Sequence, residues 1–225
     1  MFKKLEEEVE PEGPNKKEES GEVALSQIFG MSEQEPELRT LTIIGEINEE
    51  LSKDVMAALW YLENNAKIKE LVNPEDPNCE ETKEVIQPIE IVISTNGGSA
   101  DDMFAIYDAI RWVRKTIDVE TYGLGKVMSA GTLILAAGTK GKRYLSSHCR
   151  VMMHSVNGGH VGELHNLQNE MEQMAGLQDS YIQAMSCETS MTKKQLQSLI
   201  NKKINIYLDA EETIAKGLAD EVWNG

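Results

Sequence analysis

Apolar positions along the chain follow two spacings in turn, and this pattern predicts strands that alternate with helices. Runs of β-branched and other apolar residues, such as TLTIIGEI and IEIVIS, are typical of buried strands. The predicted strands are 40–47, 89–94, 119–125, 150–156 and 204–208. Apolar residues three and four apart predict helices at 48–64, 103–116, from about 129, 192–203 and 210–222. This alternation indicates an α/β fold.

The longest helix is predicted over residues 161–186, where apolar side chains form one continuous stripe at helical spacing. The stripe consists of Leu164, Leu167, Met171, Met174, Leu177, Tyr181 and Met185. At roughly 1.5 Å per residue such a helix is about 37 Å long, more than a compact domain of this size needs to cover itself. We therefore expect part of the stripe to pack against another subunit.

Two segments lack this periodicity. Residues 1–37 are rich in Glu, Pro, Gly and Ser, which predicts an acidic, mobile arm in front of one folded domain at 38–225. Residues 66–88 combine many charges with prolines, which predicts an excursion over the surface.

Charge and composition exclude several classes of protein. The net charge of −16 among 225 residues disfavours binding to nucleic acid, which depends on Lys and Arg. No apolar run approaches the roughly 18 residues of a membrane span, and the charged N-terminus does not resemble a secretory signal, so we expect a cytoplasmic protein. The cysteines Cys79, Cys149 and Cys187 lack the spacing of a disulfide framework or a zinc site.

Other motifs for cofactors are missing as well. His160 and His165 are five residues apart and would lie about 140° apart around a helix, so they cannot share a metal as an i, i+4 pair does. The chain contains no G-x-x-x-x-G-K-[ST] motif for ATP. We expect no metal, no cofactor, and a separate protein as any ATP-driven motor.

Ser129 is the candidate nucleophile, because it stands directly before a predicted helix of small apolar residues. A nucleophilic serine needs a base and backbone N–H donors for the oxyanion. His154, at the end of RVMMH, is a candidate base, and donors could come from Ala130 and from the Gly97-Gly98 pair. Each also has an ordinary structural interpretation, as a helix cap, a core histidine, the first turn of a helix, or a tight turn. The nucleophile elbow G-x-S-x-G of α/β-hydrolases is absent.

The segment GKVMSAGTLILAAGTKGKRYLSSHCRVMMHSVNGG closely resembles the active-site region of the ClpP family, the proteolytic subunits of the Clp protease (peptidase family S14). Shared features are the serine before a small-residue helix, the turn AAGTKGKRY, the strand that ends in histidine, and the paired glycines. Upstream, ISTNGGSADD resembles the family's Gly-Gly turn, and IYLDAEETIAKGLADEV resembles its closing strand and helix. The resemblance extends over about residues 39–223.

The resemblance implies a ClpP/crotonase-like spiral of ββα units with a protruding handle helix, here 161–186. In that family the handles interleave to join two seven-membered rings around a closed chamber. Hexameric AAA+ unfoldases such as ClpX, ClpA or ClpC deliver unfolded polypeptides and insert loops into apolar clefts at the ring edge. We therefore expect a homo-oligomer of stacked heptameric rings with an unfoldase partner. Trp112 could line such a cleft or belong to the core.

The resemblance also assigns roles to residues. It implies a serine endopeptidase in which Ser129 is the nucleophile and His154 the general base and then acid. The oxyanion hole is formed by the N–H groups of Gly98 and Ala130. An extended substrate pairs with the chain at Gly97, Ser99 and Ala100 and, beyond the histidine, at Ser155.

This sequence departs from the family at the third member of the triad. Asn205 occupies the position where an aspartate usually stands, with Asp209 the next candidate. An asparagine can orient a histidine but supplies no charge. A ring subunit with little or no peptidase activity is therefore the main alternative function. A crotonase-like enzyme that acts on a CoA thioester is a second.

Overall fold

The computed structural model of the protein describes residues 38–76, 79–159, 161–202 and 204–223. The arm predicted at 1–37, as well as His160, lies outside these residues. Within the described ranges, none of the helices combines the length and apolar character that crossing a bilayer requires.

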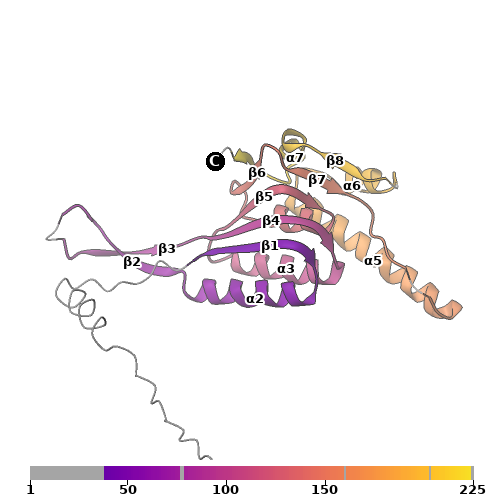
Figure 1. Ribbon diagram of the computed structural model, residues 1–225, viewed down its shortest axis with the longest axis horizontal. Coiled ribbons are helices and arrows are strands. Elements are labelled where there is room, and N and C mark those ends of the chain that lie inside the picture. Colours follow the sequence, from indigo (N-terminus) through magenta and orange to yellow (C-terminus); the bar gives the residue numbers. More distant parts are fainter. Residues whose placement is uncertain (1–37, 77–78, 160, 203, 224–225) are drawn as a thin grey trace, which may run out of the picture. The chain divides into compact units, whose positions relative to one another are not determined.

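A mostly parallel sheet forms the centre of the folded unit (Figure 1). Its order is β1-β4-β5-β6-β9, and β7 pairs with both β5 and β8. Only the β7/β8 pair among these described strands is antiparallel. The strands are β1 (Thr40–Ile47), β4 (Ile89–Gly98), β5 (Val119–Met128), β6 (Arg143–Ser146), β7 (Arg150–Met153), β8 (Ile206–Leu208) and β9 (Glu221–Trp223). The prediction of an α/β fold is confirmed.

Helices connect the strands and cover the sheet. They are α2 (Glu49–Asn64), α3 (Ala100–Val113), α4 (Ala130–Ala136), α5 (Leu164–Glu188), α6 (Lys193–Ile200) and α7 (Ala210–Ala215). α2 and α3 lie side by side below the sheet in Figure 1. Alternate residues of β4 are buried, Ile89, Ile91 and Ile93 completely, and they form the core with the apolar faces of these helices.

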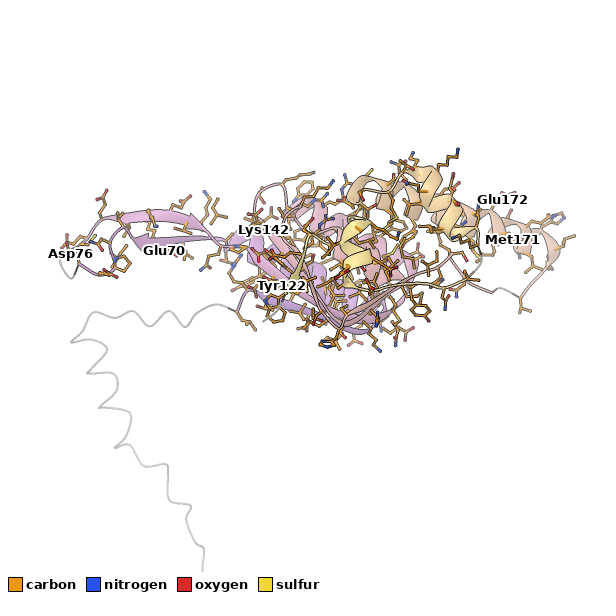
Figure 2. The ribbon with its side chains drawn as sticks, turned by 90° about the horizontal axis from the view of Figure 1, so that it is seen from above. Glu70, Asp76, Tyr122, Lys142, Met171 and Glu172 are labelled. Carbon is orange, nitrogen blue, oxygen red and sulfur yellow. The ribbon has the colours of Figure 1, made fainter. Side chains whose placement is uncertain are left out.

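Residues 66–88, expected as a surface excursion, form a hairpin of β2 (Lys67–Leu71) and β3 (Thr82–Ile86) whose side chains are mostly exposed. Figure 2 shows the hairpin, marked by Glu70 and Asp76, at one end of the folded unit and the start of α5, marked by Met171, at the other.

α5 is buried only in its C-terminal part. Tyr181, Ile182, Ala184, Met185 and Glu188 are its buried residues. Further towards its start, Leu164 and Met171 are 67% and 71% exposed. The apolar stripe predicted from the sequence is therefore only partly covered within this chain.

An ion pair ties the end of the chain to the sheet. Arg143 is 4% exposed, and its Nε and Nη2 donate to Asp220 at 2.8 and 2.5 Å. The same guanidinium donates to the carbonyl oxygen of Glu188 at 2.8 Å. Arg143 thereby joins β6, the end of α5 and the segment before β9.

Candidate active site

The C-terminal ends of three parallel strands bring the candidate residues together. The first half of β5 pairs with β6, and its last residues pair with β7, so that Met128 lies opposite Met152. Because parallel strands end at the same edge, Ser129 after β5 and His154 after β7 are neighbours at this edge. β4 ends at the same edge with Gly97 and Gly98.

Ser129 has an unusual backbone conformation, with φ 53° and ψ −120°. It is the non-glycine residue with positive φ among those the structure describes. A conformation of this kind costs on the order of 1–3 kcal/mol and is concentrated at functional sites. Its side chain makes no capping hydrogen bond to α4, although it occupies the N-cap position. Ser129 therefore occupies the N-cap position of α4 without capping the helix through its hydroxyl.

Gly97 allows β4 to approach this serine closely. Its φ is +99°, and a Cβ atom added to Gly97 would lie 2.5 Å from Ser129 Cβ. A Cβ atom on Gly98 would collide with the backbone of Ile47 in β1. The interpretation of the glycine pair as a tight turn is therefore wrong: both residues belong to β4, and the packing of β4 against β1 and Ser129 requires them.

His154 is half-buried, and its Nδ1 lies 2.5 Å from the carbonyl oxygen of Ser155. A carbonyl oxygen can only accept, so we assign the proton to Nδ1. The neutral ring then carries its lone pair on Nε2, which is the tautomer that a general base needs. Among the hydrogen bonds of the described residues, none joins Ser129 to His154.

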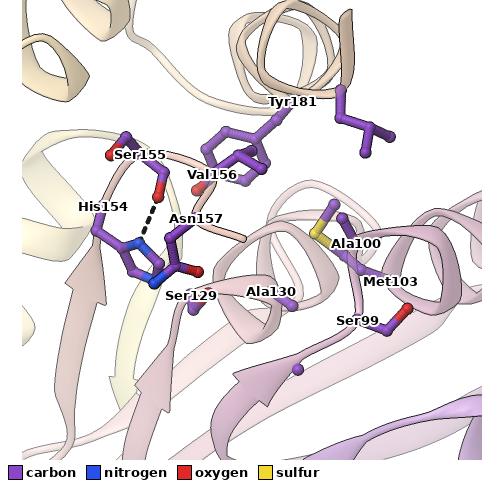
Figure 3. A pocket seen from close by; sticks show the side chains of 12 residues that line it. Ser99, Ala100, Met103, Ser129, Ala130, His154, Ser155, Val156, Asn157 and Tyr181 are labelled. Carbon is purple, nitrogen blue, oxygen red and sulfur yellow. Dashed lines mark hydrogen bonds between the residues drawn. The ribbon is translucent and has the colours of Figure 1, made fainter. Parts of the chain in front are cut away.

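One pocket contains most of the predicted site residues (Figure 3). Its lining includes the predicted Ser129, His154, Gly98, Ala130, Ser99, Ala100 and Ser155. Gly97 contacts Ser129 from β4 without lining the pocket. The structure thus gathers side chains from distant parts of the chain around one serine hydroxyl.

Asn205 is not among the residues that line this pocket. It is exposed and immediately precedes β8. The antiparallel register pairs Met153 with Ile206, so one further step of the same ladder would place Asn205 opposite His154. Asp209 instead accepts a hydrogen bond from the Glu212 N–H at 2.9 Å and caps α7.

Further residues of the pocket were not predicted as site residues: Met103, Val156, Asn157, Leu177 and Tyr181. Leu177 and Tyr181 lie four residues apart on one face of α5, and both belong to the apolar stripe that helical spacing predicts. Figure 3 shows Tyr181 and Asn157 on the same side of the pocket as His154. Helical spacing alone does not distinguish a core position from a pocket wall.

Among the described residues, no group of three or more His, Cys, Asp or Glu side chains is arranged to hold a metal ion.

Comparison with known proteins identifies the family. A family model described as Clp protease matches residues 79–225. The chain is 34% identical to ATP-dependent Clp protease proteolytic subunit 2 of Chlamydia trachomatis serovar D over 82% of its own length and 80% of the relative's. Proteolytic subunit 1 of Chlamydia felis is 32% identical over the same shares. The chain belongs to the Clp protease family.

Proposed function

We propose that the chain is a serine endopeptidase subunit of a self-compartmentalising Clp-type protease, which hydrolyses unfolded polypeptides to short peptides. The observation that carries this proposal is one pocket lined both by Ser129, with its strained backbone, and by His154, whose Nδ1 faces a carbonyl oxygen. A protease with a serine nucleophile needs this pair at one end of a peptide-binding groove.

In the proposed reaction, His154 Nε2 takes the hydroxyl proton as Ser129 Oγ attacks the substrate carbonyl. Apo enzymes often lack the short catalytic hydrogen bond, so His154 must first move within about 3 Å of Ser129 Oγ. The protonated imidazole then donates to the leaving amine, and water attacks the acyl-enzyme by the reverse proton path.

The oxyanion that forms on the substrate would accept from two backbone N–H groups. Ala130 is the first residue of α4, where helical N–H groups have no intrahelical acceptor. The Ser99 N–H donates to Ile47 at 2.9 Å on the β1 side. Successive N–H groups of an extended chain point to opposite sides. The Gly98 N–H is therefore directed away from β1.

An extended substrate would lie along the end of β4 beyond Thr95, where the pairing of β4 with β5 has stopped. Its backbone would run past Gly97, Ser99 and Ala100 on one side of the scissile bond and past Ser155 on the other, a form of β-augmentation. Backbone pairing of this kind depends little on sequence, which suits the degradation of many unfolded chains.

The assembly we propose is a homo-oligomer of stacked rings that acts in the cytoplasm with an AAA+ unfoldase. The exposed Leu164 and Met171 of α5 support a contact with a second subunit. An aromatic groove formed by Glu90, Val92, Tyr122, Leu124 and Trp223 supports docking of an apolar loop. Tyr122 stacks on Tyr144 beside this groove, with ring centres 4.9 Å apart. Trp112 does not line the groove and does not belong to the core, because it lies on α3 and is 61% exposed.

A fluorophosphonate probe tests the proposed function directly, because it reacts only with an activated serine. We expect one label per subunit, located at Ser129 by mass spectrometry, together with cleavage of an unstructured fluorogenic peptide and the native mass of a ring assembly. A folded assembly that takes up no label and cleaves no peptide would support the alternative, a structural ring subunit.

Asn205 is the third catalytic residue in this proposal. Once the β7/β8 ladder extends by one pair, its amide oxygen accepts from His154 Nδ1–H in place of the Ser155 carbonyl oxygen. Asn205→Asp is expected to retain or raise kcat, by up to about tenfold, since the added charge stabilises the imidazolium. Asn205→Ala, measured in the same peptide assay, gives the kcat that remains when residue 205 cannot accept a hydrogen bond from His154. If the kcat of Asn205→Asp falls to that of Asn205→Ala, Asn205 is not the residue that orients His154.

A further inference from the structure

A buried chain of hydroxyl groups connects α5 to the backbone of Ser129. Thr132, in the first turn of α4, is completely buried, and its Oγ1 lies 2.6 Å from the carbonyl oxygen of Ser129. The hydroxyl of Tyr181 lies 2.7 Å from Thr132 Oγ1. Tyr181 is itself only 6% exposed.

The direction of these hydrogen bonds follows from the acceptor at their end. The Ser129 carbonyl can only accept, so the single hydroxyl proton of Thr132 is directed to it. Thr132 Oγ1 must then accept, and the Tyr181 hydroxyl donates. Burial raises the pKa of Tyr181 to about 12, so this donor stays protonated at neutral pH.

The oxygen that accepts from Thr132 belongs to the same peptide unit as the Ala130 N–H. A trans peptide is planar, and its N–H points opposite to its C=O. The Ser129 oxygen also accepts from the Thr132 N–H at 3.0 Å. Two hydrogen bonds on the oxygen therefore fix the direction of the Ala130 N–H, and they polarise it as a donor.

The nitrogen side of Ser129 is fixed as well, because its N–H donates to the Met152 carbonyl of β7 at 2.8 Å. A strained conformation such as that of Ser129 persists only where the surroundings determine it on several sides. On the carbonyl side, the surroundings are Thr132 and, behind it, Tyr181.

We propose that Tyr181 and Thr132 are positioning residues, which hold the Ser129–Ala130 peptide unit so that its N–H is aimed at the substrate oxyanion. This rests on the proposed serine peptidase function. The relay from Tyr181 through Thr132 to the Ser129 oxygen acts on the transition state, because the ground-state carbonyl carries little charge. Its loss lowers kcat and leaves KM nearly unchanged.

Two isosteric variants break the relay at different links. Thr132→Val removes the hydrogen bond to the Ser129 oxygen, and we expect kcat to fall about 100-fold, comparable to the loss of an oxyanion donor. Tyr181→Phe leaves Thr132 in place, and we expect a fall of about tenfold. The double variant should be no slower than Thr132→Val, since residues of one relay are not additive. Thr132→Ser keeps the hydroxyl and should restore activity to within about threefold of wild type.

Tyr107→Phe is the matched control. Tyr107 is also buried, at 3% exposure, and its hydroxyl also bonds to α5, at Glu188 Oε1, 3.0 Å away. The variant thus removes a similar contact with the same helix but leaves the relay intact, and we expect kcat to be unchanged. An equal loss in Tyr107→Phe and Tyr181→Phe would overturn the proposal in favour of a general loosening of α5.

Hydrogen exchange of the peptide that covers residues 129–137 separates this proposal from the proposed function. Thr132→Val and Tyr181→Phe are expected to speed exchange in that peptide at least about tenfold relative to Tyr107→Phe. If the wild type neither labels nor cleaves, the peptidase proposal fails, and faster exchange would still demonstrate the relay. Unchanged exchange and unchanged kcat in both variants would refute it.

Discussion

Replacement of Ser129 by alanine is expected to slow the cleavage of an unstructured fluorogenic peptide by about 10⁶-fold in kcat, because loss of the nucleophile removes acyl transfer entirely. Alanine keeps the Cβ atom of the serine and removes only the hydroxyl, which makes no capping hydrogen bond, so the fold should be unaffected. The native mass and circular dichroism spectrum of the variant should therefore equal those of the wild type. The measurement is the rate of peptide hydrolysis at substrate saturation. Fluorophosphonate labelling of the same sample sets an upper limit on the amount of contaminating wild-type protein.

Ser147→Ala is the matched control for this variant. Ser147 also has a histidine partner, because its Oγ lies 3.1 Å from His148 Nδ1. That pair stands on an exposed turn between β6 and β7 and does not line the active-site pocket. We expect full activity, since a serine and a histidine in contact do not suffice without an oxyanion hole. Cleavage by Ser129→Ala within tenfold of wild type would identify another nucleophile.

Asp220→Ala is expected to have the largest effect on stability, a loss of about 3 kcal/mol, because it leaves the buried Arg143 guanidinium with backbone carbonyls but no opposite charge. Arg143 is 4% exposed and its partner side chain 24%. For a chain of this size such a loss lowers the melting temperature by about 6–12 °C. Unfolding should be followed at a fixed protein concentration, since assembly also contributes to stability.

The effect of Asp220→Ala should depend on pH. Burial by itself would raise the pKa of Asp220, but hydrogen bonds and charge from Arg143, together with backbone N–H groups, outweigh it and hold the pKa below its ordinary value of 3.8. A depressed carboxyl pKa stabilises the folded state at pH values above 3.8, and this contribution is lost as the pH falls through the lowered pKa. The difference in the free energy of unfolding between Asp220→Ala and wild type should therefore become smaller below pH 3.8.

Asp118→Ala is the matched control for Asp220→Ala, because it removes the carboxylate of a solvent-exposed ion pair. Asp118 pairs with Lys142 at 3.0 Å, but the two side chains are 48% and 37% exposed. An exposed pair of this kind contributes about 0–1 kcal/mol. If both aspartate variants lose the same stability, burial of Arg143 is not the reason for the effect at Asp220.

Periodic segments were predictable where one face of an element is buried along its whole length. β4 and α3 are such elements, and the structure confirms the expected strand and helix there. The prediction of a helix at 210–222 is wrong in its second half. Apolar residues continue at helical spacing, but α7 ends at Ala215, because Gly217 adopts a positive φ of 74° and the chain then enters β9.

The strand predicted at 150–156 also ends early. β7 ends at Met153, because its pairing with β5 stops where β5 itself ends at Met128. Val156 continues the apolar pattern yet lines the pocket. β6, with four residues, is too short to show any periodicity of its own.

The candidate site could be predicted in part, because Ser129 and His154 directly follow recognisable strands and the glycine pair forms the end of another. Tyr181 and Thr132 could not, because a buried hydroxyl on a helix has the same spacing as any core side chain. Their partners come from tertiary packing of α4 against α5, which a linear pattern does not contain.

The pairing of β7 with β8 has a consequence for how the protein is made. Ser129 and His154 leave the ribosome well before the segment 206–208 that completes the edge of β7, and before Asp220, which clamps Arg143. Domains fold as units during synthesis. A nascent chain that already contains Ser129 and His154 therefore still lacks the segments that complete the fold around them. If the proposed peptidase function holds, cleavage therefore depends on segments that are synthesised well after the proposed nucleophile and base.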